Sequence, residues 1–422
     1  MYRTEVPLYG DLIELVGEIN DATLQRDTAL TARLQRNAET ERLDLERHGA
    51  IRVGTADELA MIGRAFAVMG MAPVSYYNLA PAGVPVHSTA FRPVDPGALA
   101  RNPFRVFCSL LRLELIEDAA LREEAAQTLA RRDIFTAGAR ELIATAETNG
   151  GLNADQADRF VAELLETFRW HAEATVSADT YARLVAAHRL IADVVSFKGP
   201  HINHLTPRTL DIDAAQAAMP ERGITPKETI EGPPARACPI LLRQTSFKAL
   251  EEAIAFPSGE GAVAGVHTAR FGEIEQRGCA LTPTGRALYD EALARKDFSA
   301  LPDDWETLRR GDLAWFRYRP TLKGLAERAE TDDLDALIAQ GAVAAEPITY
   351  EDFLPVSAAG IFQSNLGAEA RAAAYAVDPA KAEFEQALGR PVLDEMALYQ
   401  AEQDASLAET LTALGLSRSV PA

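Results

Sequence analysis

Helical and strand-like hydrophobic spacing alternate along the chain. Residues 5–47 place apolar side chains three and four apart, which predicts helix. HGAIRVGT (48–55) looks like a strand, and its final Gly-Thr predicts a cap for the following helix, ADELAMIGRAFAVMG. Residues 71–79 and 84–94 are rich in Val, Tyr and Phe and are separated by the turn signal APAG. They predict two further strands.

Helical spacing dominates the next hundred residues, from FRVFCSLLRLELI to TYARLVAAHRLIADVV, and strand patterns return after them. The last part is Ala-rich helix interrupted by the loop ITYEDFLPVSAAGIFQSNL. We therefore expect an α+β chain that forms a single composite domain over 1–422. Its expected parts are β-containing regions at about 48–94 and 191–320, a helical insertion at about 95–190, and a C-terminal helical region with a substrate loop at about 321–422.

The charge balance excludes two classes of partner. The chain has 422 residues, of which 47% are hydrophobic and 25% charged, as in globular proteins. Its 42 Lys and Arg against 62 Asp and Glu give a net charge of −20. An acidic protein repels phosphate backbones and anionic lipid, so we expect neither a nucleic-acid nor a membrane partner. An anionic substrate would need a local cationic group.

Cysteine usage and hydropathy indicate a cytoplasmic protein. The three cysteines are scattered, with no CxxC pair, which gives neither a disulfide framework nor a thiolate zinc site. The N-terminal residues lack a signal-peptide pattern, and no window resembles a membrane span. The chain also has no GxGxxG, phosphate loop, GxSxG or HExxH motif, so nucleotide-dependent and serine-hydrolase functions have no support.

Histidines in the strand segments are the first chemical signal. Of seven histidines, five lie in predicted strands or at their edges: His48, His87, His201, His204 and His267. In a strand, positions 48, 50 and 52 point the same way, so His48 and Arg52 would flank one face. That pair suits a carboxylate ligand that also touches a metal. The alternative is a surface pair on an edge strand.

The segment FKGPHINHLTPRTLD is dense in polar side chains, as functional loops often are. His201 and His204 are three apart in extended chain and face opposite ways, so we expect only one of them to be a ligand. The remaining alternative is a hydrogen-bonded loop that joins the two β-containing parts.

TARFGEIEQRG places Glu273 and Glu275 on one strand face. Buried carboxylates are costly unless they are paired or bound to a metal. An ion pair with Arg270 or Arg277 is one explanation. The other is that a glutamate completes a 2-His-1-carboxylate triad, which leaves positions open on Fe(II) for a chelating substrate and dioxygen.

Four long blocks carry a family resemblance: HGAIRVGT, VPVHSTAFRPV, FKGPHINHLTPRTLDID and ARFGEIEQRGCALTPTGRALYD. With them the chain closely resembles the 2-oxoadipate dioxygenase/decarboxylase family, also called hydroxyglutarate synthases, over essentially its whole length. The resemblance implies a vicinal-oxygen-chelate-like curved β-sheet core cupping a metal, with large helical insertions and a helical C-terminus. It implies Fe(II) held by His48, His204 and Glu273, with Glu275 as the alternative to Glu273.

The resemblance also implies how substrate binds. Arg52 corresponds to the substrate-binding arginine, and Val356 and Ser357 match the loop that contacts the other end of the substrate. No catalytic residue beyond the metal centre and no protein partner are implied. The implied reaction, in lysine catabolism, converts 2-oxoadipate and O2 to 2-hydroxyglutarate and CO2 by decarboxylation followed by hydroxylation within the same molecule.

Two other functions remain open on the sequence. One is a metal-dependent isomerase or lyase of the vicinal-oxygen-chelate type, which would need no O2. The other is a non-catalytic metabolite-binding protein, which would bind metal and ligand without forming product.

Overall fold

The computed structural model describes residues 1–247, 250–259, 261–327, 331–354 and 380–416. Their contacts separate two compact units. Unit 1 comprises Met1–Glu231, Gln244–Gln276 and Phe353–Leu393, and unit 2 comprises Gly232–Arg243, Arg277–Asp352 and Asp394–Ala422. The single composite domain stays a prediction.

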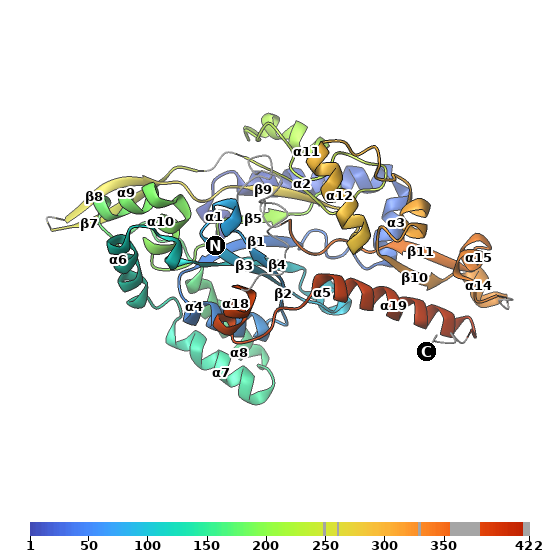
Figure 1. The fold of residues 1–422 in the computed structure, drawn as a ribbon, viewed down its shortest axis with the longest axis horizontal. Coiled ribbons are helices and arrows are strands. Elements are labelled where there is room, and N and C mark those ends of the chain that lie inside the picture. The colour runs from blue at the N-terminus through green and yellow to red at the C-terminus, as the bar shows by residue number, and fades with distance from the viewer. Residues whose placement is uncertain (248–249, 260, 328–330, 355–379, 417–422) are drawn as a thin grey trace. The chain divides into compact units, whose positions relative to one another are not determined.

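A five-stranded mixed sheet forms the centre of unit 1 (Figure 1), in the order β2-β3-β4-β1-β5. Its strands are β1 (Arg47–Val53), β2 (Ala72–Asn78), β3 (Val86–Arg92), β4 (Phe104–Leu111) and β5 (His204–Pro207). β1 runs parallel to β4 and antiparallel to β5, with Ala50 opposite His204. The predicted strands at 48–55, 71–79 and 84–94 are thereby confirmed.

The prediction that FRVFCSLLRLELI is helical is wrong, because most of it forms β4 between β3 and β1. Seven of the eight residues of β4 are buried. A strand covered on both faces shows a nearly continuous apolar run instead of alternation. Such a run has no period that separates it from a buried helix.

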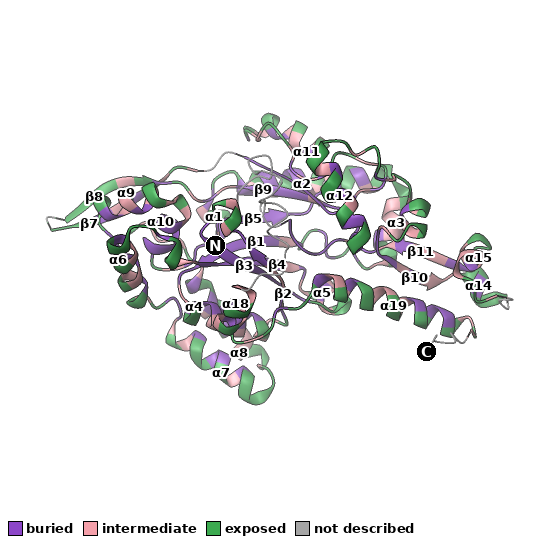
Figure 2. Ribbon diagram, viewed as in Figure 1, coloured by how far each residue is buried: buried purple, intermediate pink, exposed green. Residues whose placement is uncertain are grey.

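The two faces of β1 meet different surroundings. Ala50 packs in a cluster with Phe107 and Phe353, whereas Ile51 packs in another with residues of the next helix. On the Ile51 side, an apolar cavity of about 280 Å³ is lined in part by Gly49, Ile51 and Phe66. The sheet therefore has core on both sides, and Figure 2 shows its strands as buried.

Apolar spacing predicted helix over 5–47, but the structure divides this region into three helices, the last of which ends at Arg36, and has turns over 37–46. Thr55 caps the helix after β1 by accepting a hydrogen bond from Glu58 N. The helices of unit 1 are α1 (Tyr2–Glu5), α2 (Tyr9–Arg26), α3 (Thr28–Arg36), α4 (Ala56–Val68), α5 (Pro96–Arg101), α6 (Ala119–Ala130), α7 (Ala137–Asn149), α8 (Ala154–Thr167), α9 (Ala178–Ala187), α10 (Arg189–Val195), α11 (Ile212–Ala218) and α18 (Ala380–Leu388), with 3-10 turns η1 (Ala80–Ala82), η2 (Leu113–Leu115) and η3 (Met219–Arg222).

Four further strands lie after the sheet in sequence. β7 (Glu252–Ser258) and β8 (Gly261–His267) form an antiparallel hairpin in unit 1. β6 (Leu242–Ser246) pairs with β9 (Glu273–Arg277). The predicted strand at TARFGEIEQRG is thus shorter than the motif and begins at Glu273.

Unit 2 is built around a small antiparallel pair, β10 (Phe316–Pro320) and β11 (Val343–Pro347). The C-terminal helix α19 packs along β10, where Phe316 N donates to Gln403 and Tyr318 N donates to Ser406. The helical C-terminus is confirmed, although β11 lies within the region expected to be helical. The helices of unit 2 are α12 (Pro283–Arg295), α13 (Trp305–Arg310), α14 (Leu322–Ala326), α15 (Leu334–Ala339) and α19 (Glu395–Ala413).

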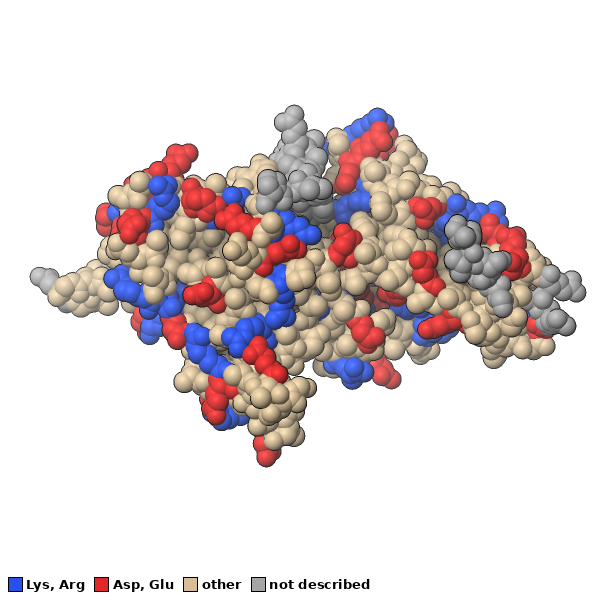
Figure 3. Space-filling model, turned by 60° about the horizontal axis from the view of Figure 1, so that its bottom comes forward, with Lys and Arg blue, Asp and Glu red and all other residues tan. Residues whose placement is uncertain are grey.

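The described surface carries charges of both signs. On the face drawn in Figure 3, acidic side chains lie among basic ones, so the cationic groups there are interspersed. Among the described residues, every helix is too short or too polar to cross a bilayer.

Candidate metal centre

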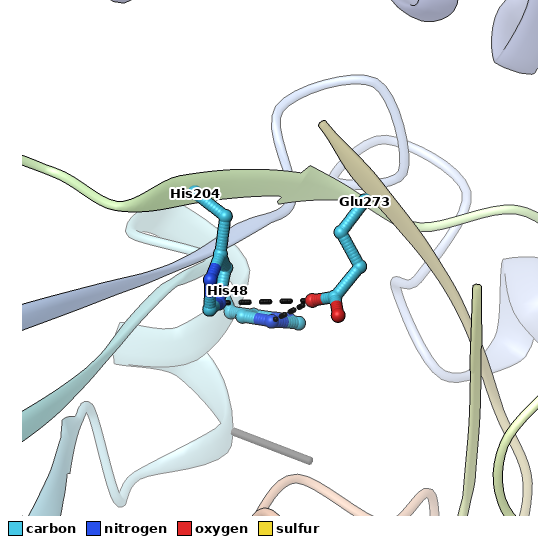
Figure 4. A group of neighbouring side chains, drawn as sticks. All are labelled: His48, His204 and Glu273. Atoms are coloured by element: carbon cyan, nitrogen blue, oxygen red, sulfur yellow. Dashed lines mark hydrogen bonds and ion pairs between the residues drawn. The ribbon is translucent and has the colours of Figure 1, made fainter. Parts of the chain in front are cut away.

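Side chains from three strands of unit 1 converge at one point (Figure 4). His48 on β1 and His204 on β5 lie on the same sheet face, because His204 is opposite Ala50, two residues from His48. Glu273, the first residue of β9, directs its carboxylate at both rings. Its Oε2 is 3.0 Å from His48 Nε2 and 3.6 Å from His204 Nε2. All three side chains are buried, and their ligand atoms could hold one metal ion.

Glu275 contacts the other side of the His48 ring, with its Oε2 2.7 Å from Nδ1. A carboxylate that accepts from Nδ1–H fixes the tautomer in which Nε2 carries the lone pair. The two glutamates therefore differ in position. Glu273 lies within the ligand group, and Glu275 lies behind His48.

The polar atoms of this group suit a cation. With Nδ1–H donated to Glu275, a neutral His48 would face the Glu273 oxygen with a lone pair, at only 3.0 Å. Both ring nitrogens of His204 are buried, and neither has a hydrogen-bond partner among the described residues. Unpaired buried polar atoms cost free energy. A metal ion would satisfy all three donors at once, and two imidazoles with one carboxylate are the donor set that suits non-haem Fe(II).

Neighbouring groups hold the ligands in place. Glu273 Oε2 accepts hydrogen bonds from Thr206 Oγ1 at 2.9 Å and Gln244 Nε2 at 3.1 Å. The Phe353 ring meets the His48 ring edge-on at 5.1 Å, and the Phe271 ring lies 4.9 Å from the His204 ring. These apolar walls exclude water and keep the local dielectric low.

Burial and charge shift the two histidines in opposite directions. Burial lowers the pKa of His48, but the carboxylates of Glu275 and Glu273 outweigh burial and raise that pKa above its ordinary value of 6.5. Burial lowers the pKa of His204 to about 4. Burial raises the pKa of Glu273, but the contacts with His48, His204 and Thr206 outweigh burial and hold that pKa below its ordinary value. When no metal is bound, a protonated His48 provides the positive charge between the carboxylates of Glu273 and Glu275.

Arg52 lies on the same face of β1 as His48, as the alternation predicted, and it is buried. Its Nη1 donates to Asp193 Oδ2 at 2.6 Å. Val356 and Ser357, the residues expected at the other end of the substrate, lie outside the described residues. Their role stays a prediction.

The ion-pair explanation for the β9 carboxylates fails for Arg270, which pairs with Glu252 and Glu5 instead. His201 and His204 do separate, as expected. His204 joins the ligand group, whereas His201 lies 3.1 Å from Asp193 in a second group with His267.

Sequence reasoning missed Asp193. It lies in the apolar run LIADVV at the end of α10, where the spacing predicts only a helix. A single carboxylate in such a run is a signal, because a buried charge needs partners. The remaining strand histidine, His87, packs against the rings of Phe384 and Tyr76.

Comparisons with known proteins agree over nearly the whole chain. A family model described as 2-oxoadipate dioxygenase/decarboxylase matches residues 1–365. The chain is 58% identical over 424 residues to the 2-oxoadipate dioxygenase/decarboxylase of Escherichia coli (strain K12), covering 96% of this chain and 94% of the relative. It is 56% identical over 441 residues to the protein of that name from Pseudomonas putida, covering 99% and 95%.

A solved structure gives the same result for the fold. The hydroxyglutarate synthase from Pseudomonas putida, in complex with 2-oxoadipate, superposes with a TM-score of 0.90 at 54% identity, over 99% of this chain and 96% of that one. The predicted α+β fold class, with its curved sheet, helical insertions and helical C-terminus, is confirmed.

We predict that Glu275→Gln weakens metal binding without abolishing it. The amide oxygen can still accept from His48 Nδ1–H, but the charge that makes the imidazole a better ligand is lost. Loss of such a supporting carboxylate typically lowers metal affinity by about ten- to a hundredfold. Anaerobic titration with Fe(II) or Co(II) measures the change, with Glu273→Gln as the ligand variant expected to lose more. Equal affinity in wild type and Glu275→Gln would contradict this role.

We also predict that metal affinity rises with pH. His48 must lose its proton before Nε2 can bind a metal, and its pKa is raised, so protons compete with metal above pH 6.5. His204 is already neutral in that range. The same titration, repeated in buffers of increasing pH, should show affinity still increasing above 6.5, and affinity should level off at a lower pH in Glu275→Gln, where the pKa of His48 is lower. An affinity independent of pH there would refute the prediction.

Proposed function

The chain belongs to the 2-oxoadipate dioxygenase/decarboxylase family, and from this premise we propose that it binds Fe(II) at His48, His204 and Glu273 and converts 2-oxoadipate and O2 to 2-hydroxyglutarate and CO2. The proposed reaction balances in atoms. The bond between the first two carbons of the substrate breaks, and the first carbon leaves as CO2. One oxygen atom of O2 completes the new carboxyl group, and the other becomes the hydroxyl group on the neighbouring carbon. Both oxygen atoms therefore enter one product molecule, and no second 2-oxo acid is required.

The convergence of His48 Nε2, His204 Nε2 and Glu273 Oε2 carries the proposal. Two imidazoles and one carboxylate leave further positions for a substrate that chelates through a carboxylate and a 2-oxo group. Fe(II) held there would supply the Lewis acidity and the redox chemistry that O2 activation needs. That relatives at 56–58% identity carry the name of this activity supports the same assignment.

The protein's own residues hold the substrate and the ligands. Glu275 keeps His48 in the tautomer that presents Nε2, and Thr206 and Gln244 orient the Glu273 carboxylate. Phe353 and Phe271 cover the histidine rings, so bulk water is kept from the reacting groups.

Arg52 pairs with a carboxylate of the substrate. A guanidinium can donate two parallel hydrogen bonds to a carboxylate, which an ammonium cannot reproduce. It also provides the local positive charge that a dianionic substrate requires in a chain of net charge −20. Val356 and Ser357 contact the other end of the substrate in this proposal.

We further propose that this step serves lysine catabolism in the cytoplasm. The pathway follows from the family resemblance. The location is supported by cysteine usage, since Cys108, Cys238 and Cys279 are all buried and form no disulfide.

The proposal predicts substrate-dependent O2 uptake. Protein loaded anaerobically with Fe(II) should consume O2 on addition of 2-oxoadipate and release equal amounts of CO2 and 2-hydroxyglutarate. 2-Oxoglutarate and pyruvate serve as comparison substrates. His204→Ala should abolish uptake, because two ligands remain where three are needed, whereas His171→Ala, on a half-buried histidine outside the centre, should retain it.

An oxygen electrode with product analysis decides between the functions that the sequence left open. Conversion of a substrate without O2 would favour an isomerase or lyase. Metal and ligand binding with no product from any 2-oxo acid would favour a binding protein. Either result would overturn the proposed reaction.

A further inference from the structure

A second buried group of ionisable side chains lies in unit 1. Asp193 Oδ1 is 3.1 Å from His201 Nε2 and 2.9 Å from His267 Nε2. The three come from α10, from the segment before β5, and from the end of β8. Tyr181 on α9 contacts His267 Nδ1 through its hydroxyl at 2.8 Å. In Figure 1 the β7–β8 hairpin lies beside α9 and α10.

The other oxygen of Asp193 faces the metal-bearing sheet. Asp193 Oδ2 accepts from Arg52 Nη1 at 2.6 Å and from Asn203 Nδ2 at 3.3 Å. Arg52 is on the strand of His48, and Asn203 directly precedes His204. One carboxylate therefore connects the histidine pair to the strand and the segment that carry two metal ligands.

Burial makes this arrangement rigid. Asp193 and Arg52 expose 5% and 8% of their side chains, so neither charge can rely on water. Burial raises the pKa of Asp193, but His201 and Arg52 outweigh it and hold that pKa well below its ordinary value. The carboxylate is ionised and fixed by four contacts. A fixed partner restricts the rotamers of an arginine, whose side-chain entropy is otherwise large.

A second metal ion at Asp193, His201 and His267 is the competing explanation, since their ligand atoms are close enough for one. The surrounding charges oppose it. The guanidinium of Arg52 already neutralises the carboxylate, and Asn203 Nδ2 lies 3.3 Å from both Asp193 Oδ2 and His201 Nε2. At the metal centre, by contrast, the nitrogens of His204 lack hydrogen-bond partners among the described residues.

We propose that Asp193, held by His201 and His267, is a positioning residue that fixes the Arg52 guanidinium for a carboxylate of the substrate. This inference rests on the proposed function, in which the substrate is a 2-oxo dicarboxylic acid. Asp193 acts through Arg52 and contacts neither metal nor substrate. Its loss should weaken substrate binding and leave the metal in place.

A double-mutant cycle tests the inference. Equilibrium binding of 2-oxoadipate is measured without O2 on metal-loaded wild type, Asp193→Asn, Arg52→Gln and the double variant. A hydrogen bond to a charged group accounts for about a ten- to hundredfold change in affinity, so we expect a loss of that order in Arg52→Gln and about tenfold in Asp193→Asn. The double variant should bind about as weakly as Arg52→Gln alone. Additive losses would overturn the inference.

Metal content and kinetics separate positioning from a structural or metal-binding role. Wild type and Asp193→Asn should each hold one metal per chain, and KM for 2-oxoadipate should rise in the variant with little change in kcat. Two metals in wild type and one in Asp193→Asn would overturn the inference.

Glu39→Gln is the matched control, because Glu39 is a buried carboxylate in a different cluster, with Arg42 and Arg208. It should lower thermal stability without changing 2-oxoadipate affinity.

Two further arms keep the result interpretable. If Asp193→Asn does not fold, the same cycle is run with His201→Asn and His267→Asn, which each alter one contact to Asp193. If wild type binds no 2-oxoadipate, the proposed function fails. If wild type binds 2-oxoadipate and the variants at Asp193, His201 and His267 that fold bind it with the same affinity, only the positioning role fails.

Discussion

Two imidazoles and a carboxylate, buried with their electron pairs directed at one another, are the constraint on which the site depends. His48 Nε2, His204 Nε2 and Glu273 Oε2 meet where apolar rings exclude water. Such a group is unfavourable unless a cation lies among its members. A proton on His48 meets this need in part, and a metal ion meets it fully. Glu275 holds this arrangement by accepting a hydrogen bond from His48, and Thr206 and Gln244 hold it by donating hydrogen bonds to Glu273.

The register of two neighbouring segments relates the group of His48, His204 and Glu273 to Arg52. β1 presents His48 and Arg52 on one face, four residues apart. Where the chain enters β5, His204 joins the ligand group and His201 contacts Asp193, because three residues of extended chain turn a side chain to the other side. A shift of one residue in β1 would turn His48 away from His204 and Arg52 away from Asp193. The pairing of Ala50 with His204 therefore fixes the position of the ligand group relative to Arg52.

Much of the site could be predicted from the sequence because local alternation determines it. Strand spacing brought His48 and Arg52 to one face and separated His201 from His204, and the family resemblance supplied the choice of ligands. Glu273 and Glu275 could not be distinguished by alternation, since both point the same way and their roles depend on which nitrogen of His48 each meets. β4 and Asp193 were missed for a related reason. A strand buried on both faces shows no alternation of apolar and polar residues. The role of a carboxylate in an apolar helix depends on partners that are distant in sequence, as Arg52 is from Asp193.

X-ray absorption on the anaerobic, Fe(II)-loaded protein would report the ligands of the metal without depending on turnover. We expect a mononuclear centre with two imidazole ligands and otherwise oxygen ligands, and with one imidazole fewer in His204→Ala. A spectrum with sulfur ligands, or one that His204→Ala leaves unchanged, would contradict this expectation.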